Sequence, residues 1–172
     1  MPSVQDHYDR LLADHYSWSK GPFPAQVAAA TTLFEQLSIL PTAKPGEAAI
    51  DLGCGAGPHS LALARGGYAV TAIDQCAALL DELRGHAGEE TLAILEGDLL
   101  AFSDALQTPA AVIVCLGDTL THLSSEDAVT ALFASVQSAL MPGGRFVLSY
   151  RDLSAPLTGA DRFIPVRSDA DR

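Results

Sequence analysis

Hydrophobic and polar residues alternate in two different ways along this chain. In the first 40 or so positions, apolar residues recur at helical spacing over 4–16 and 24–38, which predicts two leading helices. After a break at Pro41 to Gly46, short unbroken apolar runs are separated by segments of helical spacing, which predicts strands that alternate with helices. The predicted strands are 47–52, 68–73, 91–96, 110–116 and 145–151, and the helices among them are 58–65, 77–86 and 124–140.

This alternation indicates an α/β fold with a doubly wound, mostly parallel sheet that is covered by helices on both faces. The unbroken apolar runs agree with that fold, because strands buried on both faces of a parallel sheet do not alternate. The longest helix has an N-terminal capping sequence at Ser124 and Ser125 and ends before Met141-Pro142-Gly143-Gly144. We expect an N-terminal helical cap at 1–45, a core at 46–152 and a tail at 153–172, all in one structural domain.

Composition and charge exclude several classes of function. The 172 residues fit one domain. The formal charge is −11, with 10 Lys and Arg against 21 Asp and Glu and no basic run, which argues against a nucleic acid partner. No window is apolar enough for a membrane span and the N-terminus is polar, so we expect a soluble, cytoplasmic protein. The three cysteines lie far apart and predict no metal site.

The end of the first predicted strand carries the strongest candidate site. Asp51 is followed by Gly53-Cys54-Gly55-Ala56-Gly57 and then by a helix. In open parallel sheets, ligands bind at the carboxyl ends of the strands. Alternating glycines allow close approach of a ligand, and exposed N–H groups of the loop and the helix favour an anion. A tight turn that only packs strand against helix is the alternative, but three glycines after an acid favour binding.

Acids at the next two strand ends narrow the choice of ligand. Asp74 can accept both hydroxyls of a ribose, and Asp98 can accept from an exocyclic amine while Leu99 covers a purine face. A dinucleotide fingerprint would need glycine or alanine where Pro58 stands, which argues against NAD. Taken singly, Asp74 and Asp98 are as consistent with helix N-caps as with ligand binding.

These motifs resemble those of the class I S-adenosylmethionine-dependent methyltransferases. The matching residues are Asp51 to Gly57, Asp74, Gly97-Asp98-Leu99 and Pro142-Gly143-Gly144, and the resemblance covers about 47–151. It implies a Rossmann-like sheet of order 3-2-1-4-5, S-adenosylmethionine as cofactor and methyl transfer to a small-molecule acceptor by in-line displacement. The cofactor-binding residues that it implies are Asp51, Gly53, Cys54, Gly55, Gly57, Asp74, Gln75, Asp98, Leu99, Leu116 and Tyr16.

The segment from Cys115 to Leu123 is similar to the part of glycine N-methyltransferase-like enzymes that lies beside the methionine chain and the acceptor. This resemblance implies an amine acceptor. If the acceptor is an alcohol, Asp118 or His122 would serve as the base that removes its proton. For His122, a purely structural role is the favoured alternative. The leading helices resemble the cap of the same group, in which Tyr8, Tyr16 and Trp18 would close over the cofactor or pack in the core.

The chain departs from this family at its C-terminal end. Members have seven strands with a final antiparallel hairpin, whereas here only 162–167 suggests one further strand, so we expect an incomplete hairpin. The fifth strand would then have an open edge, which predicts either a truncated chain or a homodimer that covers this edge. Two other functions stay open: a non-catalytic S-adenosylmethionine-binding module or fragment, and, as a distant third, an NAD-dependent dehydrogenase.

Overall fold

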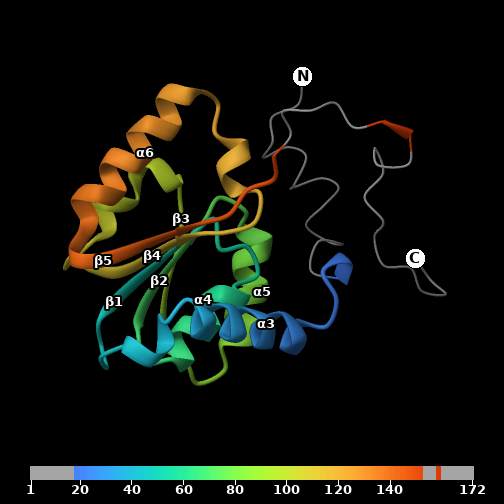
Figure 1. Ribbon diagram of the computed structural model, residues 1–172. Helices are drawn as coiled ribbons and strands as arrows, with labels where there is room; N and C mark the ends of the chain where they lie inside the picture. Colours follow the sequence, from blue (N-terminus) through green and yellow to red (C-terminus); the bar gives the residue numbers. More distant parts are fainter. Residues whose placement is uncertain (1–17, 153–157, 160–172) are drawn as a thin grey trace.

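The computed structural model describes residues 18–152 and 158–159 (Figure 1). The predicted helix 4–16, with Tyr8 and Tyr16, and the predicted strand 162–167 lie outside the described residues. The proposed boundaries of the cap, the core and the tail therefore stay a prediction.

Five strands form one sheet of order β3-β2-β1-β4-β5, and every neighbouring pair is parallel (Figure 1). The strand order and the parallel pairing that the sequence implied are thus confirmed. The register places Leu52 opposite Ile73 and Asp74 opposite Glu96, so the carboxyl ends of the first three strands lie at one edge. The strands are β1 (Ala48–Leu52), β2 (Ala69–Asp74), β3 (Leu92–Glu96), β4 (Ala110–Cys115) and β5 (Leu140–Leu148).

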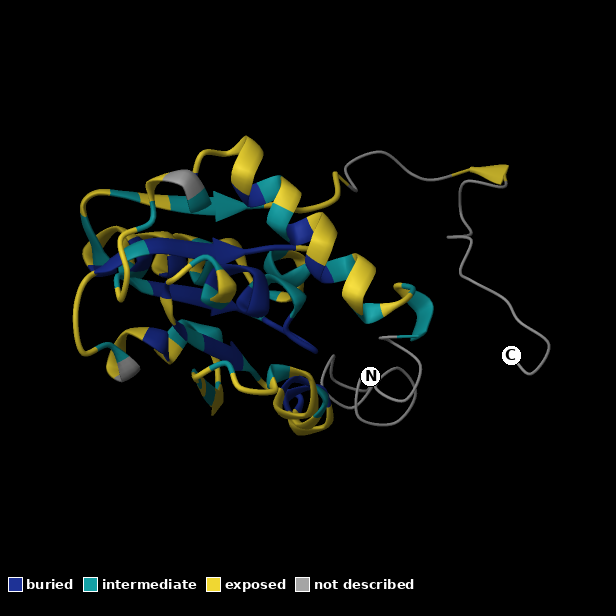
Figure 2. Cartoon of the chain, turned by 90° about the horizontal axis from the view of Figure 1, so that it is seen from below, coloured by how far each residue is buried: buried dark blue, intermediate teal, exposed yellow. Residues whose placement is uncertain are grey.

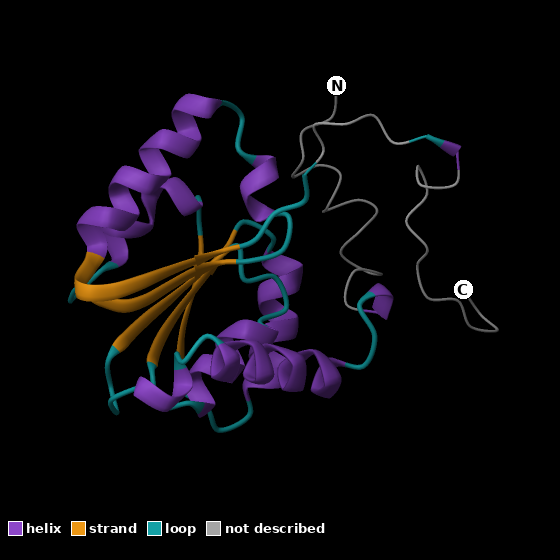
Figure 3. Cartoon of the chain, in the orientation of Figure 1, coloured by secondary structure: helices purple, strands orange, loops and turns teal. Residues whose placement is uncertain are grey.

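Helices cover both faces of the sheet, as expected for a doubly wound fold (Figure 3). The helices α3, α4 and α5 pack on one face, and α6 and the 3-10 helix η3 pack on the other. Successive residues of β1 point to opposite faces of the sheet. Ala49 packs in the core under α3 and α4, and Ile50 packs in the core under α6. The bounds are α3 (Phe23–Gln36), α4 (Pro58–Arg65), α5 (Ala77–Ala87), η3 (Leu99–Ala105) and α6 (Glu126–Ala139).

The central strands β1 and β4 are almost wholly buried between the two helical layers (Figure 2). Phe34 of α3, Ile113 of β4 and Leu132 of α6 have no exposed surface. Burying each such side chain stabilises the fold by about 1.5 to 3 kcal/mol relative to leaving it in water. The edge strand β3 is more exposed: its residues are intermediate or exposed, and none of them is buried.

The fifth strand differs from the sequence prediction of 145–151. It begins at Leu140, directly after α6, and ends at Leu148. The pairing with β4 shifts between Ala110 and Val112, and Gly143 has φ 80°. This irregularity lets the Pro-Gly-Gly segment, expected as a loop, lie within the strand. Among the described residues β5 pairs only with β4, so its outer edge is open there.

The other strands and α-helices of the described part agree with the predicted positions within a few residues. The short 3-10 helices η2 (Leu40–Thr42), η3 and η4 (Thr119–His122) were not predicted, because no helical spacing indicated them. Ser125 caps α6 as its sequence suggested, since its hydroxyl accepts from the Ala128 N–H at 3.2 Å. The C-terminal end of α3 is fixed to the sheet: Arg145 of β5 donates to the carbonyls of Leu37 and Ser38. This contact ties the segment that follows α3 to the edge strand of the sheet.

Candidate functional site

A cavity of about 330 Å³ opens beyond the carboxyl ends of β1, β2, β3 and β4. Its size lies within the range of about 300 to 1,000 Å³ that is usual for small-molecule and cofactor sites. Two predicted site residues, Asp51 and Gly57, do not line it, and Tyr16 lies outside the described residues. The predicted residues that do line it are Gly53, Cys54, Gly55, Asp74, Gln75, Asp98, Leu99, Leu116, Asp118 and His122.

The expectation that the glycine loop exposes its N–H groups was wrong for most of the loop. The N–H groups of Gly53 and Cys54 both donate to the Ile73 carbonyl, at 2.8 and 3.0 Å. The Gly55 N–H donates to Asp74 at 2.8 Å, and the Gly57 N–H donates to the Cys54 carbonyl at 2.9 Å. These N–H groups are therefore used in hydrogen bonds within the loop and to β2.

Two of the glycines are required for close packing. A Cβ on Gly53, which has φ 70°, would lie 2.3 Å from a side-chain carbon of Thr119, and one on Gly57, with φ 82°, would lie 2.2 Å from Leu83. Gly57 thus lets α4 approach α5. Gly53 lets the loop after β4 approach the loop after β1, where the Thr119 hydroxyl donates to the Leu116 carbonyl at 3.1 Å.

Asp74 joins the end of β2 to the glycine loop. One carboxylate oxygen accepts from the Gly55 N–H and the other accepts from the Cys76 N–H at 2.9 Å. A carboxylate has about four acceptor positions, so these two bonds leave capacity for ligand hydroxyls. Asp74 therefore has a structural role in the loop and still faces the cavity.

Asp98 is a helix N-cap, which is one of the two alternatives that the sequence left open. Its Oδ1 accepts from the Leu100 N–H at 2.9 Å, so it caps η3. It also lines the cavity next to the half-buried Leu99. A polar acceptor beside an apolar surface suits a purine with an exocyclic amine.

Asp51 lies beneath the loop and does not contact the cavity. It is 1% exposed, and the Ser60 hydroxyl donates to it at 2.6 Å. Burial raises the pKa of Asp51 above its ordinary value, and the nearby charge of His59 and the Ser60 hydrogen bond oppose this effect. Asp51 thus fastens the first turn of α4 to the end of β1.

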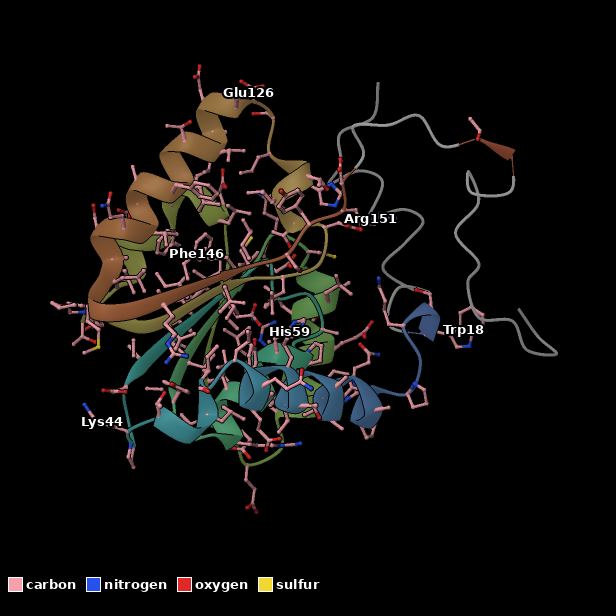
Figure 4. The ribbon with its side chains drawn as sticks, viewed as in Figure 1. Trp18, Lys44, His59, Glu126, Phe146 and Arg151 are labelled. Atoms are coloured by element: carbon pink, nitrogen blue, oxygen red, sulfur yellow. The ribbon has the colours of Figure 1, made fainter. Side chains whose placement is uncertain are left out.

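An ion pair joins the loops after β4 and β5. Arg151 donates to both carboxylate oxygens of Asp118, through Nε at 2.8 Å and through Nη2. These hydrogen bonds lower the pKa of Asp118, and the charges of Lys20 and His122 act in the same direction. Figure 4 shows Arg151 beyond the end of β5 and Lys44 at the opposite end of the sheet. The pairing makes Asp118 a poor base, because a lowered pKa weakens its hold on a proton.

Several residues of the site escaped sequence reasoning. His59 lines the cavity from the first turn of α4 and makes an edge contact with Phe34, with ring centroids 6.1 Å apart. The sequence does hold a signal that could have identified His59: it follows Pro58 at the start of the helix after the glycine loop. Lys20 and Gln26 reach the cavity from α3 and the turn before it. No local pattern marks these two residues, because folding alone brings α3 over the sheet.

Cys54, Cys76 and Cys115 are free and buried. Burial raises the pKa of Cys54 well above its usual range and that of Cys115 to about 12. Within residues 18–152, no group of three His, Cys, Asp or Glu side chains could hold a metal ion. No helix in the described part of the chain has the length and apolar character needed to cross a membrane.

Comparison with known proteins relates this site to methyl transfer. A family model described as a methyltransferase domain matches residues 49–144. The carboxy-S-adenosyl-L-methionine synthase of Pseudomonas fluorescens (strain Pf0-1) is 32% identical over 132 residues, which are 69% of this chain and 51% of that protein. The chain spans about half the length of the curated relatives that it matches.

Two solved structures share the fold. Magnesium protoporphyrin IX methyltransferase from Synechocystis PCC 6803, with bound S-adenosylmethionine, has a TM-score of 0.67 at 22% identity and covers 92% of this chain and 80% of its own. A glycopeptide N-methyltransferase complexed with S-adenosyl-L-methionine has a TM-score of 0.56 at 25% identity, over 69% of this chain and 53% of its own.

Proposed function

The chain belongs to the class I S-adenosylmethionine-dependent methyltransferases, the family whose cofactor is S-adenosylmethionine, and from this premise we propose that it transfers the cofactor's methyl group to a small-molecule amine. The identity of the acceptor and the reaction of the whole protein are what we propose; the family and its cofactor are the premise. One observation carries it: the ends of three consecutive strands, with the glycine loop, Asp74 and Asp98, line a single cavity of cofactor size.

The residues of the cavity fit the cofactor. Asp74 would accept the ribose hydroxyls, and Asp98 and Leu99 would hold the adenine. The loop around Gly53, Cys54 and Gly55 would face the methionine part through its carbonyl groups and its shape, since most of its N–H groups are used internally.

His59 and Gln26 extend this fit to the cofactor's amino acid end. Both line the cavity beside the loop. They would supply side-chain donors for the carboxylate, a role that the sequence alone assigned to main-chain N–H groups. We further propose that Gln75 and Leu116 line the cofactor and that Asp51 and Gly57 support the loop from below.

The sulfonium of the cofactor is already an electrophile, so transfer depends mainly on the acceptor. Its lone pair must lie about 3 to 3.5 Å from the methyl carbon and in line with the bond that breaks. An amine must be neutral when it reacts, so a base has to take its proton. We expect His122 rather than Asp118 to do this, because the ion pair with Arg151 lowers the pKa of Asp118 and so weakens it as a base. Asp118 would instead orient groups at the acceptor end.

An amine acceptor agrees with one relative, the glycopeptide N-methyltransferase, and with the similarity of the segment after β4 to small-molecule N-methyltransferases. The alternative is a non-catalytic cofactor-binding module.

Binding measurements with three ligands and one activity assay test the proposal. Calorimetric titration with S-adenosylmethionine, S-adenosylhomocysteine and NAD should give binding of the first two only. A panel of small amines with matched alcohols should then yield S-adenosylhomocysteine from the amines. Cofactor binding without turnover on any acceptor would support the non-catalytic module, and binding of NAD alone would overturn both.

We also propose that a second copy of the chain covers the open edge of β5, and that the protein works in the cytoplasm. The edge strand and the partly exposed pair Phe133 and Phe146, with ring centroids 5.8 Å apart, support the first statement. Sedimentation of the wild type should show a dimer, and a Val147→Pro variant should shift it to monomer. A monomeric wild type would contradict the dimer.

A further inference from the structure

Thr119 lies where two loops of the cavity meet. The strands β1 and β4 are neighbours in the sheet, and their pairing runs as far as Asp51 opposite Val114 (Figure 1). Beyond this pair, the chain after β1 enters the glycine loop, and the chain after β4 reaches Thr119, the first residue of η4. Gly53 and Thr119 both line the cavity, so the separation of the two loops shapes the cavity at this point.

The Thr119 side chain fills the space beside Gly53. The three heavy atoms nearest to a Cβ built on Gly53 all belong to Thr119: Cγ2, Oγ1 and Cβ would lie at 2.3, 2.5 and 3.0 Å from it. All three distances are shorter than the roughly 3.5 to 4.0 Å at which carbon atoms pack. A glycine at position 53 and a threonine at position 119 therefore complement each other in shape, in the way that close-packed interiors require.

The Thr119 hydroxyl fixes the orientation of this side chain. It is partly buried and donates to the Leu116 carbonyl at 3.1 Å, with the Gly53 carbonyl as a second acceptor at 3.5 Å. The shorter bond lies within the loop after β4, and the longer one reaches the glycine loop. Because a β-branched side chain has few rotamers, these bonds hold the methyl group of Thr119 against Gly53.

Each of the two loops is also held on its other side. The Gly53 N–H donates to the Ile73 carbonyl of β2 at 2.8 Å. The Gly117 N–H donates to the Ser149 hydroxyl, just after β5, at 2.8 Å. The loops are thus tied to different strands, and the Thr119 side chain occupies the space between them. Removal of its methyl group would leave a gap that these outer bonds do not fill.

We propose that Thr119 is a positioning residue: it holds the glycine loop and the loop after β4 at the separation that the amino acid part of the cofactor requires. This inference rests on the proposed function and deepens it, since it concerns the methionine end of the same site. The methyl group acts as the spacer and the hydroxyl orients it. Asp98 and Leu99, proposed to hold the adenine, follow β3, which is two strands away from β1, so a change at Thr119 should leave that end intact.

Calorimetric titration of the full chain with two ligands tests this role. S-adenosylhomocysteine and 5′-methylthioadenosine share the nucleoside and the sulfur, but only the first has the amino acid part. Thr119→Ala should weaken S-adenosylhomocysteine binding about tenfold, because it removes both the methyl group and the hydroxyl that orients it. The affinity for 5′-methylthioadenosine should change by less than about threefold, since distant groups without shared contacts act independently.

Two further variants separate shape from hydrogen bonding. Thr119→Val loses the hydroxyl bonds but should bind S-adenosylhomocysteine within about twofold of the wild type, because it has the same branching at Cβ. Thr119→Ser keeps the hydroxyl and should lose about fourfold, the value of one buried methyl group. A loss in Thr119→Val together with wild-type affinity in Thr119→Ser would overturn the proposal, since hydrogen bonds and not shape would then carry the effect.

Thr31→Ala is the matched control. The Thr31 hydroxyl is also partly buried and donates to a carbonyl, that of Val27 in α3, at 3.0 Å, and Thr31 lies outside the cavity lining. This variant removes the same atoms as Thr119→Ala and should leave both affinities unchanged. A loss of S-adenosylhomocysteine affinity as large as that of Thr119→Ala would show that general destabilisation is the cause, and would overturn the proposal.

The two ligands also distinguish failure of this inference from failure of the proposed function. If the wild type does not bind S-adenosylhomocysteine, the proposed function fails, and the role of Thr119 fails with it. If the wild type binds S-adenosylhomocysteine and Thr119→Ala binds it equally well, or loses both ligands to the same extent, only the role of Thr119 fails.

Discussion

The Asp74 carboxylate accepts a hydrogen bond from the Gly55 N–H at 2.8 Å. This bond joins the end of β2 to the loop after β1, so Asp74 shapes the glycine loop. With the proposed contact of Asp74 to the ribose, one side chain would couple cofactor affinity to loop geometry.

Asp74→Asn should weaken S-adenosylhomocysteine binding by about tenfold to a hundredfold, since it removes charge-assisted bonds to the ligand and one acceptor from the loop. Calorimetric titration measures the loss. Asp81→Asn, on the exposed face of α5, is the control and should bind normally. Full affinity in Asp74→Asn would remove the ribose assignment.

Gly53→Ala should lower the free energy of unfolding by at least about 2 kcal/mol, because its φ of 70° disfavours a side chain and the new Cβ would meet Thr119 at 2.3 Å. Gly67→Ala is the matched control: its φ is 100° with nothing within 4 Å of the Cβ, so it carries the backbone cost alone. Denaturant unfolding compares the two. A Thr119→Ala background should recover part of the Gly53→Ala loss, and equal losses for both glycines would exclude the clash.

The Asp118–Arg151 pair should stabilise the protein in a pH-dependent way. The pKa of Asp118 is lower in the folded state than its usual 3.8. Its contribution is therefore fully present above that value and is lost as pH falls through the folded pKa. Since the pair is partly exposed, we expect about 1 kcal/mol or less.

Arg151→Gln should remove this contribution at pH 7 and cause no difference at a pH well below the folded pKa. Unfolding curves at the two pH values measure the effect. On an Asp118→Asn background, the effect of Arg151→Gln should no longer depend on pH, and a pH dependence that persists there would assign it to a group other than Asp118.

Cys115 should resist thiol reagents in the folded protein. Its pKa of about 12, against an ordinary 9.0, reduces the thiolate fraction at pH 8 on the order of a thousandfold, and burial adds a steric barrier. Ellman's reagent should therefore react slowly with the native chain and rapidly in guanidinium chloride. Rapid native reaction at Cys115, located by peptide mapping, would show that β4 opens easily.

The fold followed from local pattern to a large extent. Unbroken apolar runs and the spacing of the helices between them predicted most of the elements within a few residues. The strand order came from the resemblance of the motifs rather than from the pattern. The start of β5 was missed, because a shift in its pairing with β4 depends on the neighbouring strand.

By itself, the sequence determined the acids at the strand ends, the glycine loop and the family they indicate, because each is a short segment whose chemistry depends on its own residues. Only the tertiary structure decided what these groups contact. It gave the loop N–H groups to Ile73 and Asp74, moved Asp51 out of the cavity, and joined Asp118 to Arg151 across 33 positions. Such contacts depend on how the strands align side by side, and no local pattern contains that alignment.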